Sequence, residues 1–175
     1  MAAHRTRIWF HWLTVILVSA AYLIAHYREG IDDPDARLFW LDCHRSVGLA
    51  LLALTVLRLV ARTVLPFEPL HEPNALMKIV ARITHILLYA GLVAMPLLGW
   101  AQSSAKAHKF KLFGMKFPSL VHHNADLGDL LGAWHEGIAW TLLALIGLHS
   151  AAALFHHFVL RDRVLLDMIR VNTAK

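Results

Sequence analysis

Four long apolar segments constrain this chain more than any other feature of its sequence. They cover residues 8–27, 38–65, 76–102 and 130–160. Each is long enough to cross the apolar core of a bilayer, because ~30 Å of helix takes about 20 residues. Backbone N–H and C=O groups inside lipid must be paired within their own segment, so all four are predicted to be helices. The sequence therefore predicts an all-α, integral membrane four-helix bundle, built as a single domain from residues 1–175.

The composition agrees with a chain whose main solvent is lipid. Hydrophobic residues make up 58% of the sequence and charged residues only 17%. Cys43 is the only cysteine, so no disulfide forms within the chain. We expect membrane lipid to surround this protein and expect no nucleic-acid partner.

The distribution of basic residues predicts how the bundle is oriented. Loops rich in lysine and arginine face the cytoplasm, and ten basic residues fall at the two termini and around the connection between the second and third segments, against seven on the opposite side. The ten are Arg5, Arg7, Arg58, Arg62, Lys78, Arg82, Arg161, Arg163, Arg170 and Lys175, and the seven are Arg28, Arg37, Arg45, Lys106, Lys109, Lys111 and Lys116. Both termini are therefore predicted to be cytoplasmic. Residues 161–171 alternate charged and apolar side chains, as in a short helix that lies at the membrane interface or packs against the cytoplasmic helix ends.

Histidines inside the apolar segments are the first candidates for function, because ionisable groups are costly within a membrane. His135 and His149 are 14 residues apart, which returns them to nearly the same helix face with ~21 Å between them along the axis. His44 lies about two turns into the second segment and matches the depth of His135. His11 lies about one turn into the first segment and matches the depth of His149. Two histidine pairs, one near each leaflet, are therefore predicted.

Paired neutral imidazoles suit the axial positions of haem. A structural zinc site needs about four converging ligands, and two histidines ~21 Å apart on one helix do not converge. The sequence lacks C-x-x-C-H, so any haem is held without covalent attachment. We expect two haem b groups, one between His44 and His135 and one between His11 and His149. His85 lies at the depth of His149 and is an alternative inner ligand, and a single intramembrane histidine also serves as an interhelical hydrogen-bonding group.

Several short motifs resemble the bacterial cytochrome b561 family over essentially the whole chain. They are I-x-F-H-W near the start, D-C-H-R-S-V-G in the second segment, and W-H-E and L-H-S-A-A-A-L-F-H-H in the fourth. The resemblance implies a multi-pass, di-haem b-type cytochrome of the bacterial inner membrane, with His11, His44, His135 and His149 as the haem ligands. It also implies electron transfer between the outer face and the quinone pool, as in a superoxide:quinone oxidoreductase that oxidises superoxide at the periplasmic face and reduces ubiquinone.

Further residues beside the outer site have candidate roles in such a reaction. A rim of basic residues would attract a small anion such as superoxide. The alternative is that these residues form a solvated basic loop that binds lipid headgroups or haem propionates. The lysines of this rim are Lys106, Lys109, Lys111 and Lys116. Arg45 is a candidate propionate contact. Glu136 is a candidate proton donor for quinone reduction, or a hydrogen-bonding partner for a propionate or a helix.

Two other functions are compatible with the same pattern. The chain is alternatively a membrane cytochrome b subunit that conducts electrons for a separate periplasmic dehydrogenase or hydrogenase. A haem-free channel or transporter that uses its histidines for protons or metal is a third hypothesis, although the broken helices and internal repeats of transporters are not seen.

Overall fold

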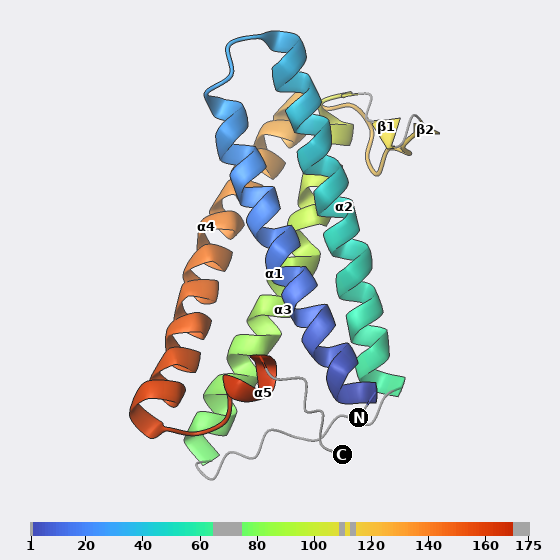
Figure 1. The fold of residues 1–175 in the computed structure, drawn as a ribbon. Coiled ribbons are helices and arrows are strands. Elements are labelled where there is room, and N and C mark those ends of the chain that lie inside the picture. Colours follow the sequence, from blue (N-terminus) through green and yellow to red (C-terminus); the bar gives the residue numbers. More distant parts are fainter. Residues whose placement is uncertain (1, 65–74, 109–110, 113–114, 170–175) are drawn as a thin grey trace.

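The computed structural model describes residues 2–64, 75–108, 111–112 and 115–169. In these segments four long helices run alternately up and down (Figure 1). They are α1 (Ala2–Glu29), α2 (Pro34–Val64), α3 (Ala75–Ala105) and α4 (Ala125–Phe155), and α4 continues as a π-helical turn, η1 (His156–Leu160). All four are long and apolar enough to cross a membrane. The predicted all-helical membrane bundle is confirmed.

The helices extend a few residues beyond most of the predicted apolar limits, because polar residues cap them outside the apolar region. The carboxylate of Asp33 accepts a hydrogen bond from the Ala36 amide at 3.1 Å, and Pro34 follows at the first helical position. Asn124 caps α4 by accepting from the Leu127 amide at 2.9 Å. Each cap satisfies a backbone donor that has no partner inside the helix.

Neighbouring helices pack in chain order, with α1 on α2, α2 on α3 and α3 on α4. Leu51, Leu92 and Leu142 form the buried centre of this packing, one each from α2, α3 and α4. Gly91 allows a close approach of α3 and α4, since a Cβ there would lie 2.9 Å from Cδ1 of Leu142. Small residues at such contacts are typical of membrane helices, whose association depends on close packing.

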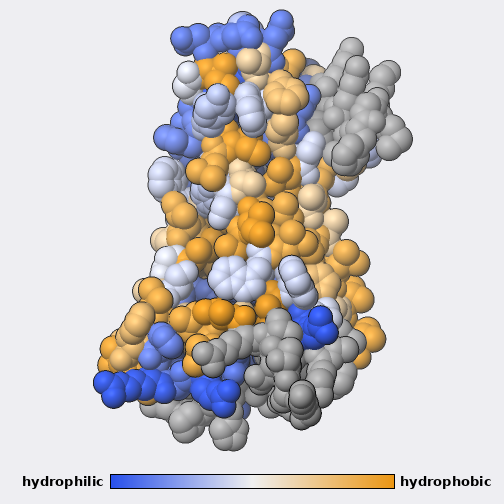
Figure 2. All heavy atoms as spheres, viewed as in Figure 1, coloured by the Kyte–Doolittle hydropathy of each residue, from blue (hydrophilic) through white to orange (hydrophobic). Residues whose placement is uncertain are grey.

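The surface of the bundle is apolar in the middle and hydrophilic at both ends, as Figure 2 shows for one face. Large hydrophobic side chains that point outward include Trp9, Leu23 and Trp140, each about two-thirds or more exposed. A band of this size is unfavourable in water and suits contact with lipid tails. The bundle is therefore built for a membrane.

The N-terminal end of α1 and helix α5 (Leu166–Ile169) lie at the same end of the bundle (Figure 1). Within the described residues α5 is shorter than the predicted helix over 161–171, and residues 170 and 171 lie outside them. The Trp12 indole donates a hydrogen bond to the Met168 carbonyl at 2.8 Å. The segment thus packs against α1, as in the second of the two expected arrangements, and its location at the membrane interface stays a prediction. Which end faces the cytoplasm stays a prediction.

The connection between α3 and α4 contains the one departure from an all-α chain among the described residues. Strands β1 (Lys111–Leu112) and β2 (Met115–Lys116) pair antiparallel. The rest of this connection is tied to the end of α3, since the Ser104 hydroxyl accepts from the Leu120 amide and the Trp100 indole donates to the Pro118 carbonyl. The loop is therefore anchored beside the end of the bundle that holds His44 and His135.

Candidate haem sites

The structure brings together the two histidine pairs that depth matching predicted. The ring centres of His44 on α2 and His135 on α4 are 6.2 Å apart. Those of His11 on α1 and His149 on α4 are 6.3 Å apart. A metal–imidazole bond is about 2 Å long and the ring centre lies about 1 Å beyond the nitrogen, so two rings on opposite sides of one iron have centres roughly 6 Å apart. Both pairs have the spacing that a single haem iron requires.

Hydrogen bonds from neighbouring helices orient the outer pair. Nδ1 of His44 lies 3.0 Å from the Ala21 carbonyl of α1, and Nδ1 of His135 lies 3.1 Å from the Met95 carbonyl of α3. A carbonyl only accepts, so each Nδ1 carries the hydrogen and donates it. Nε2 of each ring is then left with its lone pair for a metal. This is the arrangement by which proteins fix the tautomer and direction of ligating histidines.

Gly99 of α3 provides the space for the His135 ring. A Cβ at this position would lie 3.1 Å from Cε1 and 3.3 Å from Nδ1 of His135. The sequence analysis did not single out this residue. The only signal available was a small residue in an apolar helix, which is also typical of plain helix packing.

Three histidines meet at the inner site, because His85 of α3 also reaches His149. Their ring centres are 5.3 Å apart, about 1 Å closer than in either of the other two pairs. Nδ1 of His85 donates to the Ala81 carbonyl of its own helix at 2.6 Å. The distance between ring centres favours His11 over His85 as the residue opposite His149.

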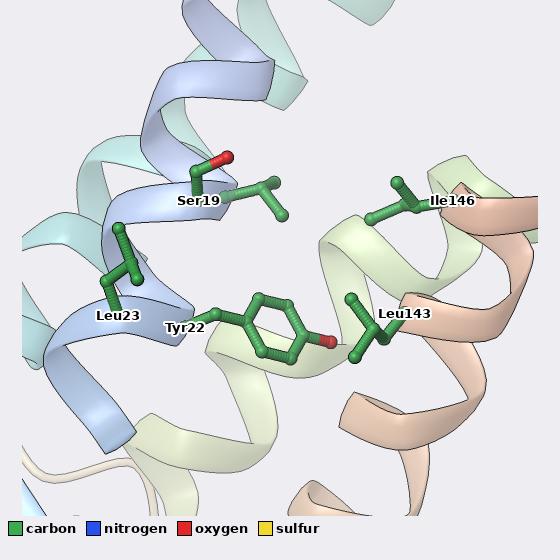
Figure 3. Close-up of a pocket in the computed structure, with 6 residues that line it drawn as sticks. Ser19, Tyr22, Leu23, Leu143 and Ile146 are labelled. Carbon is green, nitrogen blue, oxygen red and sulfur yellow. The ribbon is translucent and has the colours of Figure 1, made fainter. Parts of the chain in front are cut away.

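An apolar cavity of about 350 Å³ opens between α1 and α4 (Figure 3). Its lining includes Leu143 and Ile146, which lie between His135 and His149 along α4. Tyr22 projects from α1 across this gap, and its hydroxyl donates a hydrogen bond to the Ala139 carbonyl of α4. The space between the two histidine pairs is thus lined mainly by hydrocarbon, with one polar tie between the helices that border it.

Arg45 is largely buried near the outer pair, with 10% of its side chain exposed. Its guanidinium forms an ion pair with Asp42 at 2.8 Å and donates to the Ser103 hydroxyl at 3.1 Å. Arg45 follows His44 directly in the chain, so these contacts join the start of α2, beside His44, to the end of α3. Arg45 is therefore held in place beside His44 in the chain, and its role as a propionate contact stays a prediction.

Lys106 lies at the edge of the same region and pairs with Asp129 of α4 at 2.8 Å. Partial burial, followed by the charges of Arg45 and Lys106, lowers the pKa of His108 below its usual value. Each of the two cations is partly compensated by its carboxylate partner. The other three lysines of the predicted rim have side chains outside the described residues; they are Lys109, Lys111 and Lys116.

Glu136 is exposed on the surface of α4, next to His135 in the chain. Its candidate role as a proton donor stays a prediction. No group of three or more histidine, cysteine, aspartate or glutamate side chains that would hold a metal ion occurs among the described residues. The two histidine pairs suit the axial positions of haem.

A membrane-spanning helical bundle with paired histidines between its helices defines a class, the b-type membrane cytochromes, in which haem is held by its axial ligands and by packing. The comparison with known proteins agrees. Residues 4–170 match the prokaryotic cytochrome b561 family, and the chain belongs to it. It is a multi-pass electron-transfer protein of the bacterial inner membrane, and haem binding follows from the family.

Two relatives cover nearly the whole chain. The probable superoxide oxidase CybB of Yersinia pestis is 32% identical over 164 residues, which is 93% of this chain and 93% of that protein. Cytochrome b561 homolog 1 of Escherichia coli (strain K12) is 28% identical over 172 residues, covering 94% of this chain and 95% of that protein.

Proposed function

We propose that this protein oxidises superoxide at the periplasmic face of the inner membrane and reduces ubiquinone, with two b haems bound by its two histidine pairs. The observation that carries the proposal is the near-identical spacing of the pairs, 6.2 Å and 6.3 Å between ring centres. Their separation of ~21 Å along α4 fits one site near each leaflet. The name of the Yersinia pestis relative supports superoxide as the donor.

Each site is assigned its own residues. His44 and His135 hold the outer haem, and His11 and His149 hold the inner one. A b haem bound in this way supplies reversible one-electron chemistry. The chain orients the outer imidazoles through the Nδ1–H bonds to backbone carbonyls, and it lines the space between the two sites mainly with aliphatic side chains.

The outer end of the bundle suits an anionic donor. Arg45 and Lys106 lie at this end, each paired with an aspartate, and the α3–α4 connection carries three further lysines in its sequence. A surface with net positive charge raises the encounter rate with a small anion by ~10- to 1,000-fold at low ionic strength. Superoxide loses one electron and leaves as dioxygen, so the outer site needs no nucleophile or acid from the protein. Two superoxide ions and two protons convert one ubiquinone to ubiquinol and release two dioxygen molecules.

The proposal is tested by supplying superoxide enzymatically to the purified haem-loaded protein in the presence of a short-chain ubiquinone. We expect ubiquinol to form in proportion to superoxide consumed, at a rate that falls as salt is added. Haem that is reduced by dithionite but never by superoxide would contradict superoxide as the donor. Reduction by a co-purifying periplasmic dehydrogenase or hydrogenase would then favour the electron-conduit function.

A further inference from the structure

Arg58 is a cation inside a membrane-spanning helix, close to the inner histidine pair. It lies on α2, six residues before Val64 at the end of that helix, which is ~9 Å along the axis. Its charge acts on the rings of both His11 and His149. Charged side chains at such depth are costly and usually mark a functional site. Arg58 thus brings a positive charge to the pair that is assigned to the inner haem.

An aromatic ring of the neighbouring helix holds the Arg58 guanidinium. The guanidinium carbon lies 5.3 Å from the ring centre of Tyr89 on α3. The face of an aromatic ring attracts a cation, but the ring carries no net charge. Among the described residues, Arg58 forms no ion pair with a carboxylate. The described part of the chain therefore fixes this cation without cancelling its charge.

The outer pair has a different electrostatic environment. The charges of Arg28 and Arg45 act on His44. Arg45 is paired with the carboxylate of Asp42 at 2.8 Å. Arg28 lies in the last turn of α1, just beyond the apolar segment of that helix, where water and salt screen its charge. No charged side chain among the described residues acts on His135. The cations near the outer pair are thus compensated or screened, whereas Arg58 is neither.

We propose that the charge of Arg58 raises the reduction potential of the inner haem above that of the outer haem; this inference rests on the two proposed haem sites. A haem iron carries one positive charge less after it gains an electron, so a nearby cation favours the reduced state. One electron lost at the outer haem is then gained at the inner haem in a favourable step that needs no proton or further reactant. The charge difference between the two sites directs electrons from the outer to the inner end of the bundle.

The test is a potentiometric titration of purified haem-loaded protein. In the His44→Leu background only the inner haem is read, and in the His11→Leu background only the outer one. Two unit charges about 10 Å apart, at an effective dielectric constant of about 20, change an equilibrium constant on the order of tenfold. We therefore expect Arg58→Gln to lower the inner potential by about 59 mV, which is a tenfold change for one electron. The outer potential shifts much less.

Two further variants separate charge from contact. Arg58→Lys keeps the positive charge and retains most of the wild-type inner potential. The matched control is Arg62→Gln, which removes an exposed arginine one turn further along α2. Arg62 acts on His85 but on neither histidine of the inner pair, so its removal leaves the inner potential nearly unchanged.

Three outcomes would overturn the proposal. An unchanged inner potential in Arg58→Gln, with full haem content, would show that the charge does not reach the inner iron. An equal shift in Arg58→Lys and Arg58→Gln would make the guanidinium contacts the cause. Loss of the inner haem from Arg58→Gln would make Arg58 a residue that holds the haem in place. A wild-type protein without two haems would overturn the proposed function itself, and the haem content measured before titration distinguishes that failure from the other three.

Discussion

Replacing Gly99 with alanine tests whether the outer histidine pair depends on the close approach of α3 to the His135 ring. The new Cβ would lie 3.1 Å from Cε1 of His135, about 0.3 Å inside the 3.4 Å at which ordinary contact begins. The ring has little freedom to move away, because its Nδ1–H is held by the Met95 carbonyl at 3.1 Å. A shift of this size would lengthen that hydrogen bond toward the limit at which it is lost.

Two consequences are expected for Gly99→Ala. Overpacking of this kind costs about 1–3 kcal/mol in unfolding free energy. Weakening the hydrogen bond that orients a ligating histidine lowers affinity for the bound metal group by about 10- to 100-fold. Only the outer haem is affected, since the residues around His11 and His149 are not in contact with Gly99. Haem titration, absorption spectra of the two haems and thermal unfolding in detergent measure these effects.

Gly147→Ala is the matched control, because a Cβ there meets nothing within 4 Å. Both substitutions carry the same helix-propensity gain of alanine over glycine, about 0.5–1 kcal/mol, so the difference between them isolates the contact with His135. Equal stability and equal outer-haem affinity in the two variants would refute the reasoning.

Three more predictions follow from contacts in the same bundle. His44→Leu should remove the outer haem alone and His11→Leu the inner haem alone, as haem-to-protein ratios will show; loss of both from either variant would contradict two independent sites. Lys106→Gln should slow the reaction with superoxide several-fold at low salt and have no effect at high salt, where charges are screened; a salt-independent change would exclude steering. Tyr22→Phe removes the hydrogen bond to α4 and should lower the unfolding free energy by about 0.5–1 kcal/mol relative to Tyr27→Phe, whereas equal stability would show that the bond contributes nothing.

The fold was predictable from hydropathy, because every segment that crosses a bilayer needs about the same length and, in this chain, must be an α-helix to pair its backbone groups. Hydropathy does not show where a helix ends outside the lipid. The start of α2 depends on Asp33 and Pro34, and the start of α4 on Asn124, so most predicted limits fell short by a few residues. The strands β1 and β2 form in a loop whose only notable feature in the sequence was its positive charge. It has no periodic pattern of apolar residues that would have predicted strands.

For the histidine pairs, the sequence predicted only the depth of each residue in the membrane. Depth along a helix follows from residue counting, and it matched His44 with His135 and selected His11 or His85 for His149. Depth does not show the lateral position of a side chain, which depends on how the helices pack. The spacing of ring centres, 6.3 Å for His11 and 5.3 Å for His85, distinguishes the two in the folded bundle. For the same reason Gly99 and the Tyr22 bond to Ala139 were not visible in the sequence.

The haem content of the purified wild-type protein tests the central claim most directly. Quantification of extracted haem, combined with a reduced-minus-oxidised spectrum, should give two non-covalent b haems per chain, each with the low-spin spectrum of an iron between two imidazoles. A single haem, a five-coordinate spectrum or a colourless protein would contradict the assignment of His44 with His135 and His11 with His149.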